Sequence, residues 1–139
     1  MTDIDIAINQ IKQDEGLRLH PYTCTAGKVT IGYGRNLDDV GITAEEAEHL
    51  LTSDIEVARL DAEQFTGSAV WDGLTPARKA VIINMAFNLG ITRLSQFKRL
   101  HNSLALSSYD EAAKEMLNSR WARQVGSRAD RLAESMRHG

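Results

Sequence analysis

Glu15, Cys24 and Thr30 have types and spacing that could do chemistry together. A carboxylic acid can donate a proton to a leaving group, whereas a thiolate can act as a base or as a nucleophile. Cys24 is the only cysteine in the chain, so it cannot form an internal disulfide. A free cysteine can also be a small apolar packing residue, so the spacing alone leaves both interpretations open.

A short helix is expected to position Glu15. Isoleucines recur at helical spacing from Ile4 to Ile11, which predicts a helix over residues 3–14, and Gly16 suits a left-handed position just past its end. Glu15 then lies at the negative end of the helix dipole, which disfavours the charged carboxylate and suits a proton donor. A plain surface residue at a helix end is the alternative.

The segment 22–37 is expected to form a small β-hairpin or meander, because Thr, Val, Ile and Tyr alternate there with glycines. A two-residue turn at Ala26 and Gly27 would place Cys24 and Thr30 on opposite faces. A three-residue loop ending at Gly27 would instead make them diagonal neighbours on one face, roughly 7–8 Å apart. The glycine then falls where a left-handed backbone is needed, which favours the second register.

Two further helix starts are marked by their capping residues. The stretch "ITAEEAEHLL" begins a helix with a capping box at Thr43 and Glu46, and we expect it to run to about residue 65, with or without a break. A loop or short-turn region is predicted from about residue 65 to Thr75. Thr75 is then the N-cap of the next helix and Pro76 its first residue.

The C-terminal half of the chain is predicted to be helical. The stretch "ARKAVIINMAFNLG" is apolar nearly all round, which is typical of a central, buried helix. A second capping box is predicted at Ser108 and Glu111, and the tail is predicted to form two short helices broken near Gly126. The expected fold is mainly helical α+β, with a small β-containing lobe, a larger helical lobe and a ligand cleft between them.

Composition is that of an ordinary globular protein of one domain. No apolar run is long enough to span a bilayer, so we expect no membrane insertion. The N-terminus lacks the basic start and apolar stretch of a secretory signal, so we expect the chain to be made in a cytosol. No Cys/His spacing suggests a zinc site, and we expect no metal and no cofactor.

Charge is unevenly distributed along the chain. Residues 1–66 hold 5 basic and 13 acidic side chains, whereas residues 118–139 hold five arginines against two acidic residues. The arginines form either a solvated helix face or a cluster that meets an acidic partner or substrate, or that pairs with the acidic half of the chain. A helical DNA-binding module is one alternative function, but the net charge of −3 and the lack of a basic recognition helix argue against nucleic acid.

The order Glu, eight residues, Cys or Asp, five residues, Thr resembles the catalytic signature of the phage-type lysozymes, the endolysins of the T-even phage lysozyme family (glycoside hydrolase family 24). It lies within "DEGLRLHPY" and "GKVTIGYG". The resemblance continues in "ITAEEAEHLLTSDI", "RKAVIINMAFNLG" and "EAAKEMLNSRWARQVGSRADRL", so it covers most of the chain in order.

The resemblance implies hydrolysis of the β-1,4 bond between N-acetylmuramic acid and N-acetylglucosamine in bacterial peptidoglycan. Glu15 would be the acid and Thr30 would orient the water. Cys24 occupies the position where the T-even members usually carry an aspartate. Its thiolate could act as a base on water or attack the sugar directly, with opposite stereochemical outcomes.

The resemblance also implies the substrate-binding residues. Asn84 matches the polar residue of the central helix near the cleft. Phe87 and Asn88 lie one turn further on, where the family lines its sugar-binding groove, and Asn36 lies on the opposite wall. Core packing is an equal alternative for Phe87.

Two ion pairs are expected from the same resemblance. Asp14 and Arg128 match a charged pair that orders the surroundings of the acid. Arg35 takes a place often held by histidine and is expected to pair with Asp54, contributing about 1 kcal/mol or less if the pair is exposed.

The implied organisation is a single lysozyme-like domain over residues 1–139. Its small lobe would comprise about 15–60, and its helical lobe the N-terminal helix plus about 61–139. We expect a monomer that stays in the host cytoplasm until a holin gives it access to the cell wall.

A cysteine-dependent cell-wall peptidase or amidase is the second alternative. It would need a histidine beside Cys24 to act as its base. His20 is close in sequence, but it precedes Pro21 and would have to fold back.

Overall fold

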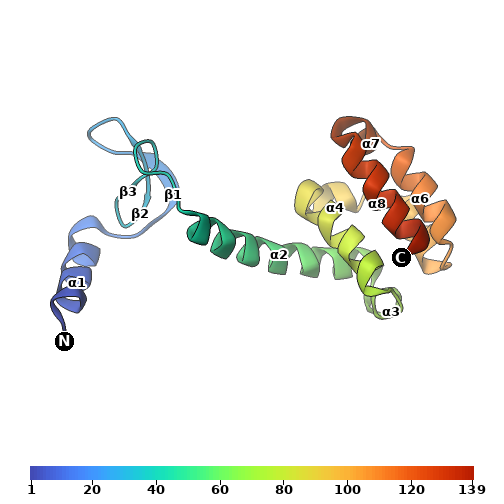
Figure 1. Ribbon diagram of the computed structural model, residues 1–139, viewed down its shortest axis with the longest axis horizontal. Coiled ribbons are helices and arrows are strands. Elements are labelled where there is room, and N and C mark those ends of the chain that lie inside the picture. The colour runs from blue at the N-terminus through green and yellow to red at the C-terminus, as the bar shows by residue number, and fades with distance from the viewer. The chain divides into compact units, whose positions relative to one another are not determined.

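The computed structural model describes all residues from 1 to 139, and the chain forms two compact units, residues 1–49 and 50–139 (Figure 1). Most of the chain is helical, and one small antiparallel sheet lies in the first unit. This confirms the predicted mainly helical α+β fold class. The predicted assignment of the N-terminal helix to the helical lobe, with a boundary near residue 60, stays a prediction.

The first unit begins with α1 (Asp3–Glu15). Thr2 caps it: its hydroxyl accepts a hydrogen bond from the backbone N–H of Asp5, whose carboxylate accepts one from the N–H of Thr2. The helix ends at Gly16, where a φ of 71° turns the chain away, as predicted. Glu15 is therefore the last helical residue, held directly before the turn into the sheet.

The sheet consists of β1 (Arg18–Thr23), β2 (Val29–Gly32) and β3 (Arg35–Asn36) in the order β1-β2-β3. Thr23 is the last residue of β1 and pairs with Val29, so Cys24 faces Lys28, and a loop of three residues, 25–27, lies between those two. The backbone N–H of Cys24 donates to the carbonyl of Lys28 at 2.9 Å.

Gly27 supplies the left-handed residue of this loop. Its φ is 79°, and its N–H donates to the carbonyl of Cys24 at 2.9 Å to close the turn. A side chain is disfavoured at this backbone conformation, which is why glycine fixes the loop length. The three-residue loop and the register predicted from the sequence are both confirmed.

Helix α2 (Ala44–Thr66) follows the sheet and runs without a break. Its predicted capping box is present, because the N–H of Thr43 donates to Glu46 at 2.9 Å and the N–H of Glu46 donates to the Thr43 hydroxyl at 3.1 Å. The box satisfies two backbone donors that have no partner within the helix.

The second unit contains six more helices: α3 (Ser68–Asp72), α4 (Pro76–Leu94), α5 (Lys98–Ala105), α6 (Tyr109–Leu117), α7 (Arg120–Val125) and α8 (Ser127–His138). Thr75 and Pro76 begin α4, and Gly126 separates the two tail helices, as predicted.

Two predictions for this unit are wrong. The segment expected to be a loop before α4 contains α3, a five-residue helix. Ser108 makes no side-chain capping bond to α6, so the second capping box is absent. Its ψ of 78° differs from the extended value of a usual N-cap, and its backbone N–H instead donates to Ser103.

The apolar core belongs to the C-terminal part of the chain, from Ala58 to Met136. Helix α8 lies between α4 and α6, and Ile82, Met85 and Met116 are fully buried (Figure 1). Each such side chain contributes about 1.5–3 kcal/mol of transfer free energy. The predicted central role of α4 is confirmed by its six buried residues.

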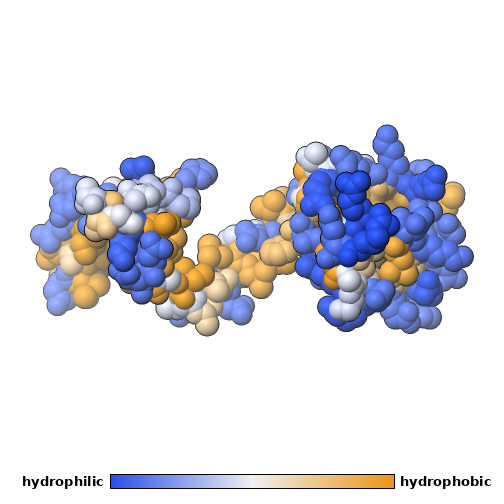
Figure 2. Space-filling model, turned by 90° about the horizontal axis from the view of Figure 1, so that it is seen from above, coloured by the Kyte–Doolittle hydropathy of each residue, from blue (hydrophilic) through white to orange (hydrophobic).

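The surface of the first unit is more apolar than that of the second in the view of Figure 2, which matches the exposed isoleucines of α1. Thr30 is the one fully buried residue of the first unit. No helix combines the length and the apolar composition that a bilayer span requires.

Candidate active site

Cys24 and Thr30 lie on the same face of the hairpin. Thr30 pairs with Tyr22 in the sheet register. Cys24 lies two residues after Tyr22, just past the end of β1, and is the diagonal neighbour of Thr30. Thr30 is only 3% exposed, whereas Cys24 is half-buried. The sheet therefore provides a fixed hydroxyl beside an accessible thiol.

The surroundings of Cys24 favour its thiolate. Hydrogen bonding from the backbone of Lys28, then from the Thr30 hydroxyl and the backbone of Ala26, lowers the pKa of the Cys24 thiol below 9.0. Partial burial opposes this effect but does not cancel it. These donors favour the thiolate, which is the form of cysteine that can act as a base or a nucleophile.

Thr30 can support chemistry in two ways. Its hydroxyl donates to the carbonyl of Lys28 at 2.9 Å. A hydroxyl has one hydrogen and two acceptor sites, so in this arrangement its lone pairs are free to accept a hydrogen bond from water. Alternatively, the hydroxyl donates its hydrogen to the Cys24 thiolate and stabilises it, and the hydrogen bond to the Lys28 carbonyl is then lost.

Asn36 lies directly opposite Thr30 on the neighbouring strand β3. The predicted sugar-binding residue thus shares the face that carries Cys24 and Thr30. Its side chain is held by Asp39: the amide nitrogen donates to the carboxylate at 2.9 Å, and the Asp39 N–H donates to the amide oxygen at 3.1 Å. The amide is therefore oriented before any ligand arrives.

Glu15 is exposed at the end of α1 and lies against the turn between β2 and β3. A Cβ atom built at Gly34 would lie 2.9 Å from Oε2 of Glu15, so a side chain there would displace the carboxyl group from this position. Gly34 also has a φ of 76°. The turn beside Glu15 belongs to the sheet that carries Thr30 and precedes Cys24 at the end of β1.

Arg35 follows that turn and is bound at three points. Its guanidinium donates to both carboxylate oxygens of Glu46, at 3.0 and 2.6 Å, and to the carbonyl of Gly41 at 3.0 Å. This pairing lowers the pKa of Glu46 to about 2. Two parallel N–H···O bonds of this kind are the strongest geometry for an exposed ion pair.

The predicted pairing of Arg35 with Asp54 is wrong. Glu46 stands in the first turn of α2, close to Arg35, because the capping box holds its carboxylate there. Asp54 lies eight residues further along the same helix, a rise of about 12 Å. Arg35 therefore pairs with Glu46, the acidic residue nearest to the start of α2.

In the second unit, Asn84 of α4 and Arg128 of α8 are in contact. Nε and Nη2 of Arg128 donate to the amide oxygen of Asn84 at 2.9 and 2.7 Å. Two predicted site residues that are 44 positions apart are thus brought together. The predicted pairing of Arg128 with Asp14 stays a prediction.

Asn88 and Phe87 lie one turn beyond Asn84. The amide oxygen of Asn88 accepts a hydrogen bond from the indole Nε1 of Trp121 at 2.9 Å. Phe87 is 45% exposed, so it is not a core residue of the second unit. An exposed aromatic ring beside fixed amides is suited to stacking on a sugar ring.

Sequence reasoning missed Gly34, Glu46 and Trp121 as site residues. Gly34 was visible only as part of a glycine-rich turn, and Glu46 only as a capping residue. The Trp121–Asn88 bond joins residues 33 positions apart, so no local pattern could reveal it.

Comparison with known proteins places the chain in one family. The family described as phage lysozyme matches residues 12–137. "Probable T4-type lysozyme 1" from Dictyostelium discoideum is 32% identical over 94% of this chain and 93% of its own length. "Probable T4-type lysozyme 2" from the same organism is 30% identical over 89% of each chain. The "Endolysin" of Acyrthosiphon pisum secondary endosymbiont phage 1 is 37% identical over 85% of this chain and 80% of its own length.

The chain therefore belongs to the phage lysozyme family. Family membership makes it a lysozyme-type glycoside hydrolase that acts on cell walls. The individual catalytic roles of Glu15, Cys24 and Thr30 remain predictions.

Substitution of Glu46 by glutamine tests the Arg35 ion pair. Glutamine keeps the capping hydrogen bond to Thr43 but removes the charge. The pKa of Glu46 is about 2 in the folded chain and 4.5 for a glutamate without these contacts. The ion pair therefore stabilises the fold fully above about pH 4.5, and this stabilisation is lost as the pH falls towards 2.

We expect E46Q to lower the unfolding temperature at pH 7 by at most roughly a few degrees. The difference from wild type should disappear as the pH approaches 2. E45Q removes a charge from the same helical turn without touching Arg35 and serves as the control. If E46Q and E45Q lower the unfolding temperature equally, or if the difference between E46Q and wild type persists near pH 2, the ion pair does not contribute to stability.

Substitution of Thr30 by valine tests the hydroxyl beside Cys24. The thiol pKa should rise above the wild-type value but remain below 9.0, because the larger effect comes from the backbone of Lys28. The pH dependence of iodoacetamide alkylation measures it. T23V makes the same change on the opposite face of β1 and should leave the alkylation curve unchanged. Equal curves for T30V and wild type would show that the hydroxyl does not reach the thiol.

Proposed function

We propose that the chain is an endolysin, a muramidase that hydrolyses the β-1,4 bond between N-acetylmuramic acid and N-acetylglucosamine in peptidoglycan to lyse a bacterial host. The observation that carries this proposal is the shared face of Cys24 and Thr30 on a sheet whose β2–β3 turn lies against Glu15. The three residues occur in the order and spacing of the family signature, within a family of lysozymes.

In the proposed reaction, Glu15 donates its proton to the glycosidic oxygen as the C–O bond breaks. The Cys24 thiolate removes a proton from a water molecule, and the oxygen of that water forms the new bond to the anomeric carbon. Thr30 accepts a hydrogen bond from the same water and aims it. The thiol later returns its proton to solvent, and Glu15 is reprotonated.

The base role for Cys24 is favoured over direct attack on the sugar. The hydroxyl of Thr30 donates to Lys28, so the side of its oxygen that is free to accept a hydrogen bond can hold water next to the sulfur. A sulfur that attacked the sugar directly would need no hydroxyl beside it to position a water molecule. The lowered pKa of Cys24 increases the thiolate fraction that either role requires.

Substrate binding is assigned to the amides and the aromatic ring already described. Asn36 would contact the sugar beside the catalytic face of the sheet, held ready by Asp39. Asn84, Phe87 and Asn88 would contact further sugars along α4. The proposed partners are peptidoglycan and, for access to it from the cytoplasm, a holin.

The alternative of a cysteine peptidase receives no support from the surroundings of Cys24. The groups that lower its pKa are Lys28, Thr30 and Ala26, and His20 is not among them. A thiol peptidase needs its histidine in hydrogen-bond reach of the sulfur.

Glu15→Gln should reduce kcat for peptidoglycan by about 10²–10⁴-fold, because glutamine cannot donate the proton. Cys24→Asp should keep activity, since a carboxylate can replace the thiolate as base, whereas Cys24→Ala should lose it. Mass analysis of the released fragments should find N-acetylmuramic acid at the reducing end. E45Q is the matched control and should behave like wild type.

Fragments cut within the peptides, or loss of activity in Cys24→Asp together with full activity in Glu15→Gln, would establish the peptidase instead.

A further inference from the structure

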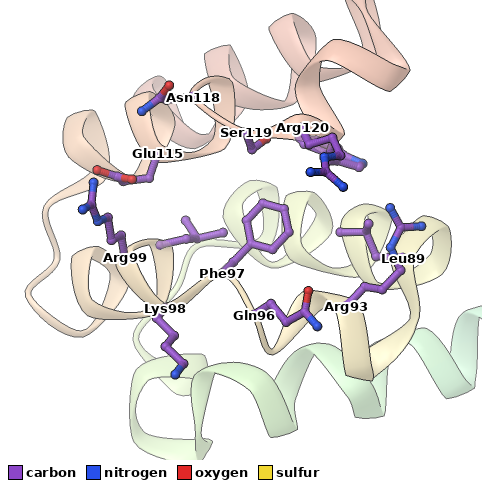
Figure 3. Close-up of a pocket in the computed structure, with 12 residues that line it drawn as sticks. Leu89, Arg93, Gln96, Phe97, Lys98, Arg99, Glu115, Asn118, Ser119 and Arg120 are labelled. Carbon is purple, nitrogen blue, oxygen red and sulfur yellow. The ribbon is translucent and has the colours of Figure 1, made fainter.

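The open pocket of the second unit adjoins the residues already proposed to bind sugars. Figure 3 shows the ring of Phe97 in the middle of this pocket, with Arg93 and Arg120 on one side. Trp121 also lines the pocket, and its indole donates to Asn88, one of the proposed sugar-binding residues. The pocket is therefore attributed to substrate binding and not to a separate ligand. The loop after β3, in the first unit, carries a different inference.

This loop completes the outer edge of β2. Strand β3 ends at Asn36, one residue before the position opposite Val29. The N–H of Leu37 still donates to the carbonyl of Val29, at 2.8 Å. In a regular antiparallel pair the Leu37 carbonyl would accept the N–H of Val29 in return, but here it accepts from Gly41 at 3.0 Å. A carboxylate oxygen of Asp38 takes its place and accepts the N–H of Val29 at 2.7 Å.

Asp38 thereby stands at one end of a chain of hydrogen bonds that reaches Thr30. The N–H of Val29 and the carbonyl of Lys28 belong to the same peptide group. That carbonyl accepts hydrogen bonds from the Thr30 hydroxyl and from the N–H of Cys24, each at 2.9 Å. A carboxylate is a charged acceptor, and hydrogen bonds in such a chain polarise one another. Asp38 therefore makes the Lys28 carbonyl a stronger acceptor for the Thr30 hydroxyl.

The strength of this carbonyl matters because the hydrogen of the Thr30 hydroxyl has two acceptors within reach. When it bonds to the Lys28 carbonyl, the lone pairs of the hydroxyl oxygen can accept a hydrogen bond from water. When it turns to the Cys24 thiolate, that bond to Lys28 is lost. Only the first arrangement aims water in the proposed reaction.

The carboxylate of Asp38 is not neutralised by a cation. It forms no ion pair within 4.0 Å, whereas its neighbour Asp39 pairs with Lys28 at 3.1 Å. Asp38 is exposed, so it has no part in the packing of the first unit. The backbone N–H of Val29 thus receives a full negative charge at its hydrogen-bond acceptor.

We propose that Asp38 is a positioning residue for the hydrolysis. Acting through the Lys28–Val29 peptide group, its carboxylate keeps the hydrogen of the Thr30 hydroxyl on the Lys28 carbonyl, so that the oxygen of Thr30 accepts a hydrogen bond from the attacking water. This inference rests on the proposed muramidase function, because it assigns the orientation of the hydroxyl a role in that reaction.

Asp38→Asn tests the proposal with the least disturbance of the sheet. The amide oxygen of asparagine can still accept the N–H of Val29, but without the charge the bond is weaker, so the amide proton signal of Val29 should move upfield in ¹H–¹⁵N NMR spectra. The kcat for peptidoglycan should fall by roughly three- to tenfold, with KM unchanged. Asp38→Ala removes the acceptor and should cost at least as much. E45Q removes a charge from the same unit and should match wild type.

A double-mutant cycle with T30V separates this role from a purely structural one. D38N should cause no further loss of kcat in the T30V background, because the hydroxyl through which Asp38 acts is absent. Alkylation by iodoacetamide gives a second measure. D38N should lower the pKa of the Cys24 thiol, because the hydroxyl then turns to the thiolate and a nearby negative charge is lost. In T30V only the charge effect remains, so the pKa should fall less.

The opposite results would overturn the proposal. If Asp38 merely held the sheet edge together, D38N would loosen the donors around Cys24 and raise the pKa of the thiol. An equal loss of kcat from D38N in the wild-type and T30V backgrounds would likewise exclude action through the hydroxyl. If wild type releases no fragments ending in N-acetylmuramic acid, the muramidase proposal itself fails. The alkylation cycle and the Val29 signal then still decide whether Asp38 orients the hydroxyl.

Discussion

The register of the β1–β2 hairpin is the constraint on which the proposed chemistry depends. Gly27 takes a left-handed conformation, which closes a three-residue loop and sets Cys24 opposite Lys28. A slip by one residue would turn Cys24 to the other face, away from the Thr30 hydroxyl. The same register places the backbone of Lys28 and the side chain of Thr30 beside the sulfur, so position and thiolate character arise together. Arg35 of β3 forms an ion pair with Glu46 at the start of α2. This contact stabilises β3, which is only two residues long.

The second unit uses a different principle to place its polar groups. Its helices pack around α4, and two polar contacts cross from α4 to the C-terminal helices, one from Asn84 to Arg128 and one from Asn88 to Trp121. Each amide oxygen therefore has a fixed direction before ligand binds, which lowers the ordering cost of recognition.

Local chemistry made much of the fold predictable, whereas tertiary geometry decided the rest. Gly27 revealed the loop register and Pro76 the start of α4, because each has a backbone requirement that acts within a few residues. The capping pattern at Ser108 failed since the backbone there is not extended. The partner of Arg35 could not be chosen from the sequence: two acids lie on one helix, and only the path of the loop before it selects Glu46. Of the candidate site, the hairpin pair was predictable, but the contacts made by Asn84 and Asn88 were not.

The most direct test of the proposed chemistry is the anomeric form of the first product, because it reports which atom attacks the sugar. If the Cys24 thiolate and the Thr30 hydroxyl direct a water molecule at the anomeric carbon, hydrolysis of the β-linked chain releases N-acetylmuramic acid first as the α-anomer. Time-resolved ¹H NMR of a defined oligosaccharide, recorded before mutarotation, measures this ratio. An excess of α-anomer in the earliest spectra is the predicted result. Initial release of the β-anomer would contradict it, because two successive displacements through a sulfur-bound sugar give that outcome.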